Sequence, residues 1–101
     1  MTIGTTTSVD DKSLPTNYYL ANYPNPFNPT TTIRYELPEA GNIKIDVFNL
    51  LGQNVAQLVN EYKPAGRYEV SFNATDISSG IYFYTLETKN KILRQKMMFL
   101  K

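Results

Sequence analysis

The chain alternates between apolar and polar residues over several short segments, with the period of two that is typical of half-buried β-strands. The alternation is clear in residues 31–37, 43–48 and 67–72. One face of each segment is apolar, whereas the other carries charged or hydroxyl side chains, Lys44 and Asp46 among them. We therefore expect three strands whose core-facing residues are Ile33, Tyr35 and Leu37, then Ile43, Ile45 and Val47, and then Tyr68, Val70 and Phe72.

Two segments near the C-terminus differ in how many of their positions are apolar. Residues 81–88 leave hardly any polar face, which predicts a central strand that is covered on both sides. Residues 93–99 alternate again, and this pattern predicts a second strand that returns beside the first. The residues expected inward are Leu93, Met97 and Phe99, and those expected outward are Arg94, Lys96, Met98 and, just beyond the strand, Leu100.

Turn residues separate the strands, in the segments 38–42, 49–52, 63–66 and 89–90. Gly52 fits a tight turn in which glycine takes a positive φ. A first strand near residues 18–22 and a short one over residues 55–59, whose inward face the pattern leaves undefined, bring the total to about seven. Because no segment has the pattern of an amphipathic helix, the sequence predicts an all-β fold, an antiparallel β-sandwich of about seven strands.

The length of 101 residues suits one folded domain. Residues 1–17 are rich in Thr and Ser and show neither the strand nor the helix period, which predicts a flexible linker. Aromatic residues and alternation begin at Tyr18, so we expect the domain to span residues 18–101. No apolar run reaches the roughly 18 residues of a membrane span, and residues 1–14 lack the pattern of a secretory signal. We expect neither membrane insertion nor N-terminal export from these residues alone.

The chain contains neither Cys nor His. This composition excludes disulfides, thiol nucleophiles, the Ser-His-Asp arrangement and most transition-metal sites. A catalytic pair of carboxylates needs opposed environments that separate its two pKa values. The two close pairs, Glu36 with Glu39 and Asp10 with Asp11, fall in a turn and in the expected linker, where both members of a pair stay solvated. We therefore expect no catalytic residues, no metal and no cofactor.

Positive charge is concentrated at the C-terminal end, although the net charge is only +1. The last thirteen residues contain no acid. They contain five basic residues, Lys89, Lys91, Arg94, Lys96 and Lys101. A solvated strand face is the simplest interpretation, and no nucleic-acid-binding motif accompanies the run, so we expect no nucleic-acid partner.

Residues 23–29, with the sequence Tyr-Pro-Asn-Pro-Phe-Asn-Pro, form the most unusual segment of the chain. Three prolines fix φ, and each Asn can close a turn through its own side chain, so we expect a stiff loop. Phe27 is the large apolar residue in its middle and is expected to plug one end of the sandwich. The loop either blocks strand addition at a sheet edge or docks a partner. The sequence leaves both possibilities open.

Four tyrosines of the predicted strands also allow two interpretations. They could form a stacking platform for a sugar or a base. They could equally be core residues whose rings are buried and whose hydroxyls lie at the rim, which the strand pattern favours. These residues are Tyr35, Tyr68, Tyr82 and Tyr84.

Several motifs occur in an order that resembles one known family, the C-terminal sorting domain of type IX secretion cargo, also called the Por secretion system C-terminal sorting domain. Asn25-Pro26 followed by Phe27-Asn28-Pro29 is similar to its Asn-Pro segment. Gly66 and Tyr68 match its middle motif, and Gly80, Ile81 and Tyr82 match its last motif. The closing residues 96–101 are similar to its terminal strand of basic and apolar residues. The resemblance covers nearly the whole chain.

The resemblance implies an Ig-like sandwich that serves as an export address and not as an enzyme. In this family an upstream cargo protein reaches the periplasm through an N-terminal signal, and its sorting domain engages shuttle proteins and the outer-membrane translocon. A sortase-like cysteine peptidase removes the domain within the preceding linker, often while attaching the cargo to surface lipopolysaccharide. The cargo ends at the outer-membrane surface or is secreted. The alternative is an Ig-like spacer or carbohydrate-binding module of an extracellular enzyme.

For partner recognition we expect two groups of residues in a domain that is itself a monomer. The last strand, at a sheet edge, would expose an apolar centre with a cationic rim. The family motifs supply the second group. The first group is Arg94, Lys96, Met98, Leu100 and Lys101, and the second is Pro24, Asn25, Pro26, Phe27, Asn28, Pro29, Gly66, Tyr68, Gly80, Ile81 and Tyr82.

Overall fold

The computed structural model describes residues 14–101, and within them the chain forms seven strands and no helix. The prediction of an all-β fold is confirmed. The expected linker, residues 1–17, lies almost entirely outside the described residues. The strands are β2 (Tyr19–Tyr23), β3 (Thr30–Leu37), β4 (Gly41–Phe48), β5 (Asn54–Lys63), β6 (Gly66–Asn73), β7 (Gly80–Glu87) and β8 (Ile92–Phe99).

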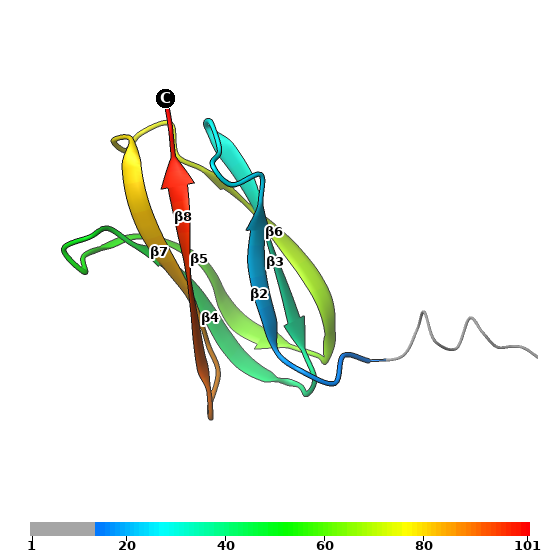
Figure 1. The fold of residues 1–101 in the computed structure, drawn as a ribbon. Helices are drawn as coiled ribbons and strands as arrows, with labels where there is room; N and C mark the ends of the chain where they lie inside the picture. Colours follow the sequence, from blue (N-terminus) through cyan, green and yellow to red (C-terminus); the bar gives the residue numbers. More distant parts are fainter. Residues whose placement is uncertain (1–13) are drawn as a thin grey trace, which may run out of the picture.

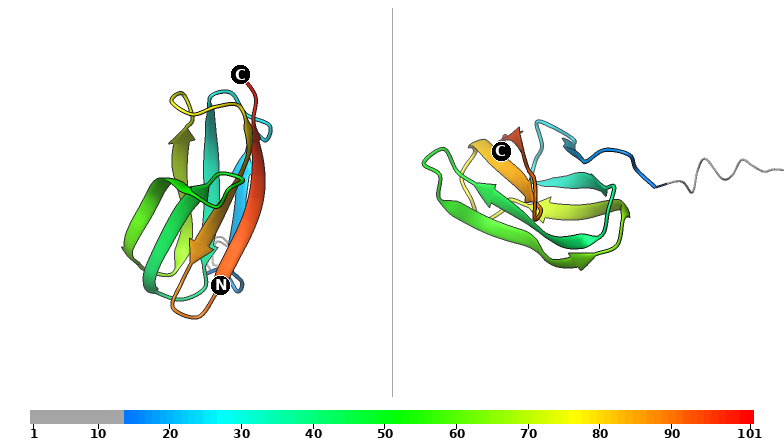
Figure 2. Two further views of the ribbon diagram at one scale, coloured as in Figure 1. Left: turned by 90° about the vertical axis from the view of Figure 1, so that its left-hand side faces the viewer. Right: turned by 90° about the horizontal axis from the view of Figure 1, so that it is seen from below.

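The strands form two antiparallel sheets that pack face to face (Figure 1). One sheet has the strand order β2-β3-β6, and the other has the order β5-β4-β7-β8. The chain crosses between the sheets after β3, after β5 and after β6, so neighbours in sequence often lie in different layers (Figure 2). This arrangement is consistent with an Ig-like sandwich.

Period-two alternation identified the core-facing residues of β3, β4 and β6 correctly. Ile33, Leu37, Ile45 and Val47 have no exposed surface, and Phe72 is 5 % exposed. In β8 the inward assignment also holds for its C-terminal half. The buried apolar core is made of Leu20, Phe27, Ile33, Tyr35, Leu37, Ile43, Ile45, Val47, Val59, Phe72, Ala74, Tyr82, Tyr84, Leu86, Met97 and Phe99.

The edge strand β5 is longer than the sequence pattern indicates, because it pairs with β4 as far as Lys63. The register between these strands shifts twice, so that Leu58 and Val55 are extra residues on β5. Each such bulge puts two residues opposite one and reverses the side to which the following residues point. This is why no single face of residues 55–59 could be assigned from their alternation.

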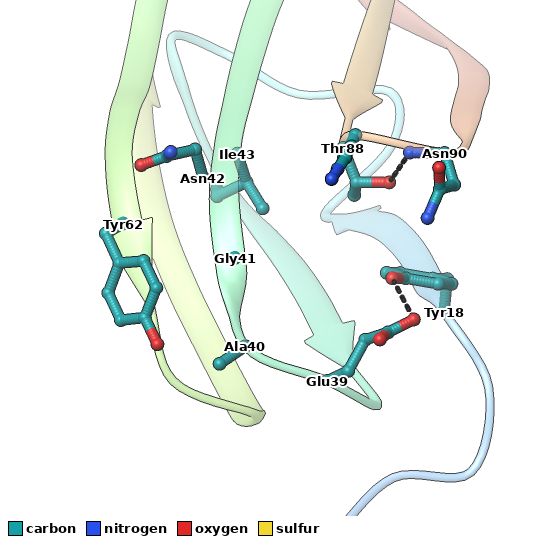
Figure 3. A pocket seen from close by; sticks show the side chains of 10 residues that line it. Tyr18, Glu39, Ala40, Gly41, Asn42, Ile43, Tyr62, Thr88 and Asn90 are labelled. Atoms are coloured by element: carbon teal, nitrogen blue, oxygen red, sulfur yellow. Dashed lines mark hydrogen bonds between the residues drawn. The ribbon is translucent and has the colours of Figure 1, made fainter.

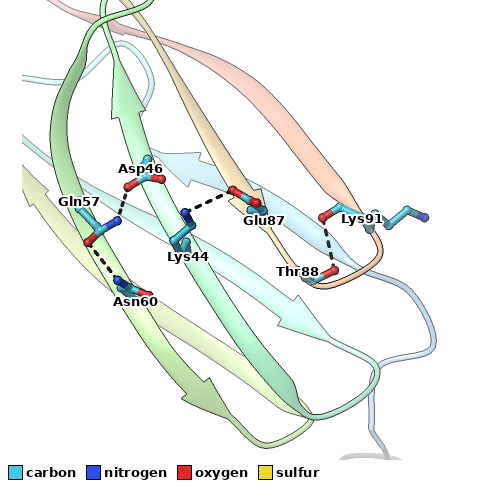
Figure 4. Close-up of polar contacts among 7 residues, drawn as sticks. All are labelled: Lys44, Asp46, Gln57, Asn60, Glu87, Thr88 and Lys91. Carbon is cyan, nitrogen blue, oxygen red and sulfur yellow. Dashed lines mark hydrogen bonds and ion pairs between the residues drawn. The ribbon is translucent and has the colours of Figure 1, made fainter.

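Asp46 points to the outer face, as predicted, where Thr85 lies opposite it on β7 and Gln57 opposite it on β5. Its carboxylate accepts a hydrogen bond of 3.0 Å from Gln57 Nε2, and Asn60 donates in turn to Gln57 (Figure 4). Asp46 is nevertheless only 6 % exposed, because β4 is an inner strand whose neighbours cover it from both sides.

β7 is the other inner strand of the four-stranded sheet, as predicted. Tyr84 and Leu86 lie in the core, and Thr85 on the outer face is 8 % exposed. Ile81 and Phe83, which also point outward, are only half-buried. The outer face of β7 is therefore only partly covered, and it retains accessible apolar surface.

Phe27 plugs one end of the sandwich, as predicted. Its side chain is 2 % exposed and stacks on Phe99, with ring centroids 5.3 Å apart. It also meets the edge of Phe72 at 6.1 Å. Aromatic pairs at these distances prefer offset-stacked or edge-on geometry, so the three rings form a compact cluster between the sheets.

The same loop closes the C-terminal half of the β8 edge. The backbone N–H of Phe27 donates to the Met98 carbonyl at 3.0 Å, and the N–H of Leu100 donates to the Phe27 carbonyl at 3.0 Å. The Asn25 side chain adds two bonds, accepting from Met98 N–H at 2.9 Å and donating to the Lys96 carbonyl at 3.3 Å. These groups are the ones that an added strand would need, so the loop occupies the edge.

Two tyrosines fasten the turns that precede their strands. The hydroxyl of Tyr68 donates to the Pro64 carbonyl and that of Tyr82 to the Ser78 carbonyl, each at 2.6 Å and each four residues upstream. The glycine two residues before each tyrosine has a positive φ, 157° before Tyr68 and 153° before Tyr82. The contact of Tyr82 resembles the tyrosine corner of Ig-like sandwiches, and Tyr68 repeats it one strand earlier.

Replacing Tyr82 with Phe removes a hydroxyl and leaves the Ser78 carbonyl without that donor. We expect Tyr82→Phe to lower the free energy of unfolding by about 1 kcal/mol, the net worth of a typical hydrogen bond. Urea unfolding measures the change. Tyr62→Phe is the matched control, because Tyr62 is 61 % exposed and should show no effect. Equal stability of the two variants would contradict the role of the corner.

Truncating Phe27 removes the plug of the sandwich. We expect Phe27→Ala to cost about 3–5 kcal/mol of unfolding free energy, as for other large-to-small substitutions of buried aromatics. Tyr23→Ala in the same segment is the control, because Tyr23 is 82 % exposed. Thermal and urea unfolding report both variants, and a loss below about 1 kcal/mol for Phe27→Ala would contradict the packing described.

Burial raises the pKa of Tyr84 well above its ordinary value of 10.0, and the nearby Tyr19 adds to the shift. The Tyr84 hydroxyl is neutral in the fold and donates to Asn22 Oδ1 at 2.9 Å. Above pH 10 the unfolded chain loses this proton while the folded chain keeps it, so stability is constant below that pH and falls above it. Tyr84→Phe should lose stability less steeply in alkaline urea titrations. Parallel curves for the two proteins would contradict the shift.

Candidate functional site

The outer face of the four-stranded sheet carries most of the C-terminal residues that were expected to contact a partner. Directly opposed residues on neighbouring strands point to the same side of a sheet, so the register defines rows of side chains. Ile81 faces Met98 in one row, and Thr85 faces Arg94 in another. Between them a third row runs across three strands and contains Phe48, Phe83 and Lys96.

The apolar side chains in these rows are partly accessible to solvent, and the cationic side chains are exposed. Met98 and Phe83 are half-buried, whereas Arg94 and Lys96 are exposed. Beyond the strand, Leu100 is 48 % exposed. Apolar centres bordered by charge are typical of protein contact surfaces, so this face has the composition of a partner site.

Lys101 follows the end of β8 and is positioned by two contacts. Its backbone N–H donates to Ser79 Oγ at 3.0 Å. Its ammonium lies 6.0 Å from the ring centroid of Phe99, at the limit of a cation–π contact. The C-terminal end is therefore held against the start of β7, at the end of the sandwich remote from the described N-terminal segment (Figure 1).

The cations at the C-terminal end have no carboxylate partner in the described part of the chain. Arg94, Lys96 and Lys101 make no salt bridge within residues 14–101. The surface of the sheet therefore has an uncompensated positive region along β8. The salt bridges are Arg34–Glu69 at 2.9 Å, Lys44–Glu87 at 3.7 Å (Figure 4), Lys63–Glu61 at 3.0 Å and Arg67–Glu36 at 3.6 Å.

The turn between β4 and β5 presents two leucines to solvent. Leu50 is 65 % exposed and Leu51 is 82 % exposed. Asn49 fixes the turn through its side chain, whose oxygen accepts from the N–H of Leu51 at 2.9 Å and of Gln53 at 3.0 Å. Gly52 has a φ of 83°, as predicted for this turn. The sequence pattern indicated the turn but not its apolar tip, and two adjacent leucines within turn residues were the available signal.

This turn forms one wall of a hollow of about 360 Å³ on the outer face. Apolar surface and one cation are therefore brought together in a single depression. Its lining consists of Phe48, Asn49, Leu50, Gly52, Phe83 and Arg94.

A second hollow, of about 320 Å³, lies at the opposite end of β4, close to the described N-terminal segment (Figure 3). Tyr18, Glu39, Asn42 and Tyr62 line part of it. The Tyr18 hydroxyl donates to Glu39 Oε2 at 3.5 Å, a long contact. Its lining holds a single carboxylate, that of Glu39, and a single ammonium, that of Lys89.

Two groups with shifted pKa values lie beside Tyr68. Tyr68 stacks on Tyr35 at 5.3 Å, and burial raises the pKa of the Tyr35 hydroxyl. Lys63 lies 5.0 Å from the Tyr68 ring centroid, and its hydrogen bond to Glu61 raises the pKa of its ammonium. Both shifts favour the form already present at neutral pH. The corner therefore serves packing.

The tyrosine platform considered from the sequence is not present. Tyr35, Tyr82 and Tyr84 are buried, so the interpretation as core residues is confirmed. The structure exposes other tyrosines instead. Tyr19 and Tyr23 lie on the outer face of β2, at 46 % and 82 % exposure, and Tyr62 on β5 is 61 % exposed.

The family motifs occupy positions of two kinds. Phe27 and Tyr82 are buried, and Gly66 and Gly80 shape the turns before their strands. The remaining residues of the loop are exposed around Phe27. Those exposed residues are Pro24, Asn25, Pro26, Asn28 and Pro29.

No group of three or more acidic residues, the metal-ligating type that this chain possesses, is arranged to hold an ion within residues 14–101. No helix in that part of the chain is long and apolar enough to cross a bilayer.

A comparison with curated proteins finds none that matches this sequence. Among solved structures, the crystal structure of dimeric latent PorU from Porphyromonas gingivalis is similar, with a TM-score of 0.61 and 18 % identity. The similar region covers 80 % of this chain and 9 % of that one, and at this identity it supports the fold alone. The sequence model of the family described as "Secretion system C-terminal sorting domain" matches residues 21–100, from within β2 to the residue after β8. The chain therefore belongs to the C-terminal sorting domains of type IX secretion.

Proposed function

We propose that residues 18–101 act as a non-catalytic address for a cargo domain that precedes residue 1 in the full polypeptide. Family membership implies a type IX sorting signal and export to the cell surface or the medium. The observation that carries the proposal is the extent of the match. It includes the Pro-rich loop, both tyrosine-fastened turns and β8, so the matched unit is the sandwich from within β2 onward.

The motif residues of the domain have two roles in this function. Phe27, Gly66, Gly80 and Tyr82 act indirectly, since they hold the loop and the strand starts in place. Direct contact with shuttle proteins and the outer-membrane translocon falls to exposed side chains. These are the loop residues around Phe27 and, at the C-terminal end, Arg94, Lys96, Met98, Leu100 and Lys101.

Residues 1–17 serve as the cleavable linker. A sortase-like cysteine peptidase removes the domain there after the cargo has crossed the periplasm. The Thr- and Ser-rich composition supports this, because a polar segment whose sequence lacks the strand and the helix period can enter a protease cleft without unfolding the sandwich.

The direct test fuses residues 1–101 behind a signal-bearing fluorescent protein. We expect the reporter to leave cells that have the type IX machinery and to stay in the periplasm of cells that lack it. The control carries residues 1–17 only and should stay inside both. Retention of the full fusion in both hosts would contradict the proposal, as would its export from both.

The position of cleavage is tested on the same exported reporter. Mass spectrometry of its new C-terminus should place the cut within residues 1–17. A cut after Tyr18 would remove part of the folded unit from the address and would contradict the linker assignment.

The competing function, a spacer or carbohydrate-binding module, has one observation in its favour. Tyr19 and Tyr23 lie four residues apart on β2, so their exposed rings point to the same side. A polysaccharide pull-down with the wild type and with a Tyr19→Ala, Tyr23→Ala double variant separates the functions. Tyrosine-dependent binding without reporter export would favour the module.

A further inference from the structure

The hollow beside the β4–β5 turn combines features that the fold itself does not require. Asn49 and Gly52 define the turn, and Leu51 contributes to it only through its backbone N–H, so neither leucine side chain is needed for its geometry. Leucine side chains exposed by 65 % and 82 % leave apolar area in water. Figures 1 and 2, which show the turn from different sides, agree that it projects from the body of the sandwich. Exposed, contiguous apolar surface of this kind marks a contact site.

The charge around the hollow indicates which kind of partner can bind there. Arg94 lines it, and Lys96 lies opposite Phe83 in the adjoining row. Neither cation has a carboxylate partner within residues 14–101. Asp46 lies in the row of Arg94, with Thr85 between them, but it is 6 % exposed and bonded to Gln57. The accessible charge at the hollow is therefore positive, which complements an acid.

The closed edge of β8 determines how a partner can bind. Four hydrogen bonds from Asn25 and Phe27 already use the outward backbone groups between Lys96 and Leu100. A partner strand cannot pair there without displacing the loop. The side chains on the sheet face remain accessible, so binding through the face needs no rearrangement of the domain.

We infer that this hollow is a docking site for an acidic protein segment in which an apolar side chain is flanked by carboxylates. The apolar side chain packs on Phe48, Phe83 and Leu50, and the carboxylates pair with Arg94 and Lys96. The row formed by Ile81 and Met98 extends the contact toward the C-terminal end. The identity of the segment as part of the export machinery rests on the proposed function, whereas the chemistry of the hollow rests on the geometry above.

The first test uses isotope-labelled chain 1–101 and two short blocked peptides followed by NMR. One peptide has a leucine between two glutamates, and its twin has glutamines in their place. We expect the acidic peptide to shift the resonances of residues 48–52, Phe83 and Arg94, and the neutral twin to shift them at least about tenfold less at the same concentration. Absence of shifts, equal shifts with both peptides, or shifts confined to β2 would overturn the inference.

The second test measures export of the fluorescent fusion. Leu50→Ser and Arg94→Glu should each slow export by about tenfold or more, with unchanged thermal unfolding of the purified domain, because both residues line the hollow. Lys89→Glu is the charge control and Tyr62→Ser the apolar control, because both residues are exposed and remote from this hollow. Wild-type export speed in Leu50→Ser and Arg94→Glu would overturn the inference and leave the sorting function intact.

If even the wild-type fusion stays inside a host that has the type IX machinery, the proposed sorting function is contradicted. The NMR titration with the two peptides then tests the docking site by itself.

Two other occupants of the hollow are outcomes of the same experiments. Dimerisation of the wild type in sedimentation that Leu50→Ser abolishes would assign the face to a second copy. Arg94-dependent binding to vesicles of anionic phospholipid would assign it to a lipid surface. Either result would overturn the inference of an acidic protein segment.

Discussion

The contact between the Pro-rich loop and the end of β8 is the interaction on which the rest of the domain depends. It joins residues 73 positions apart, through Asn25 and Met98, and it places Phe27 against Phe99 between the two sheets. A single loop thus supplies core packing and edge protection at once. Without it, the final strand would present both an open end of the core and unpaired backbone groups.

This arrangement explains how a sorting domain can carry an apolar and basic strand at its surface. An uncovered edge with Met98 and Leu100 beside it would favour strand addition by any extended chain. With the edge occupied, the same side chains remain accessible only through the sheet face. Recognition then depends on the positions of side chains such as Phe83 and Arg94, which gives a partner more specificity than backbone pairing does.

Alternation within a strand predicted those features of the fold that depend on that strand alone. Alternation located β3 and β6 because one face of each is buried and the other solvated. It failed for β5, where bulges at Leu58 and Val55 change the period. It placed Asp46 correctly on the outer face but could not predict its burial, since lateral cover by Gln57 depends on which strand lies beside β4. The candidate site was predicted in part, because the exposed cations of β8 follow from its own pattern. The contribution of the β4–β5 turn required the sheet order.

The most direct measurement of the central claim is native-state hydrogen exchange at the amides of Met98 and Leu100. Both N–H groups donate to the Pro-rich loop, so the account predicts that they exchange as slowly as the inner-strand amides of β7. Exchange at the rate of unprotected surface amides would show that the edge is open, and would contradict the account.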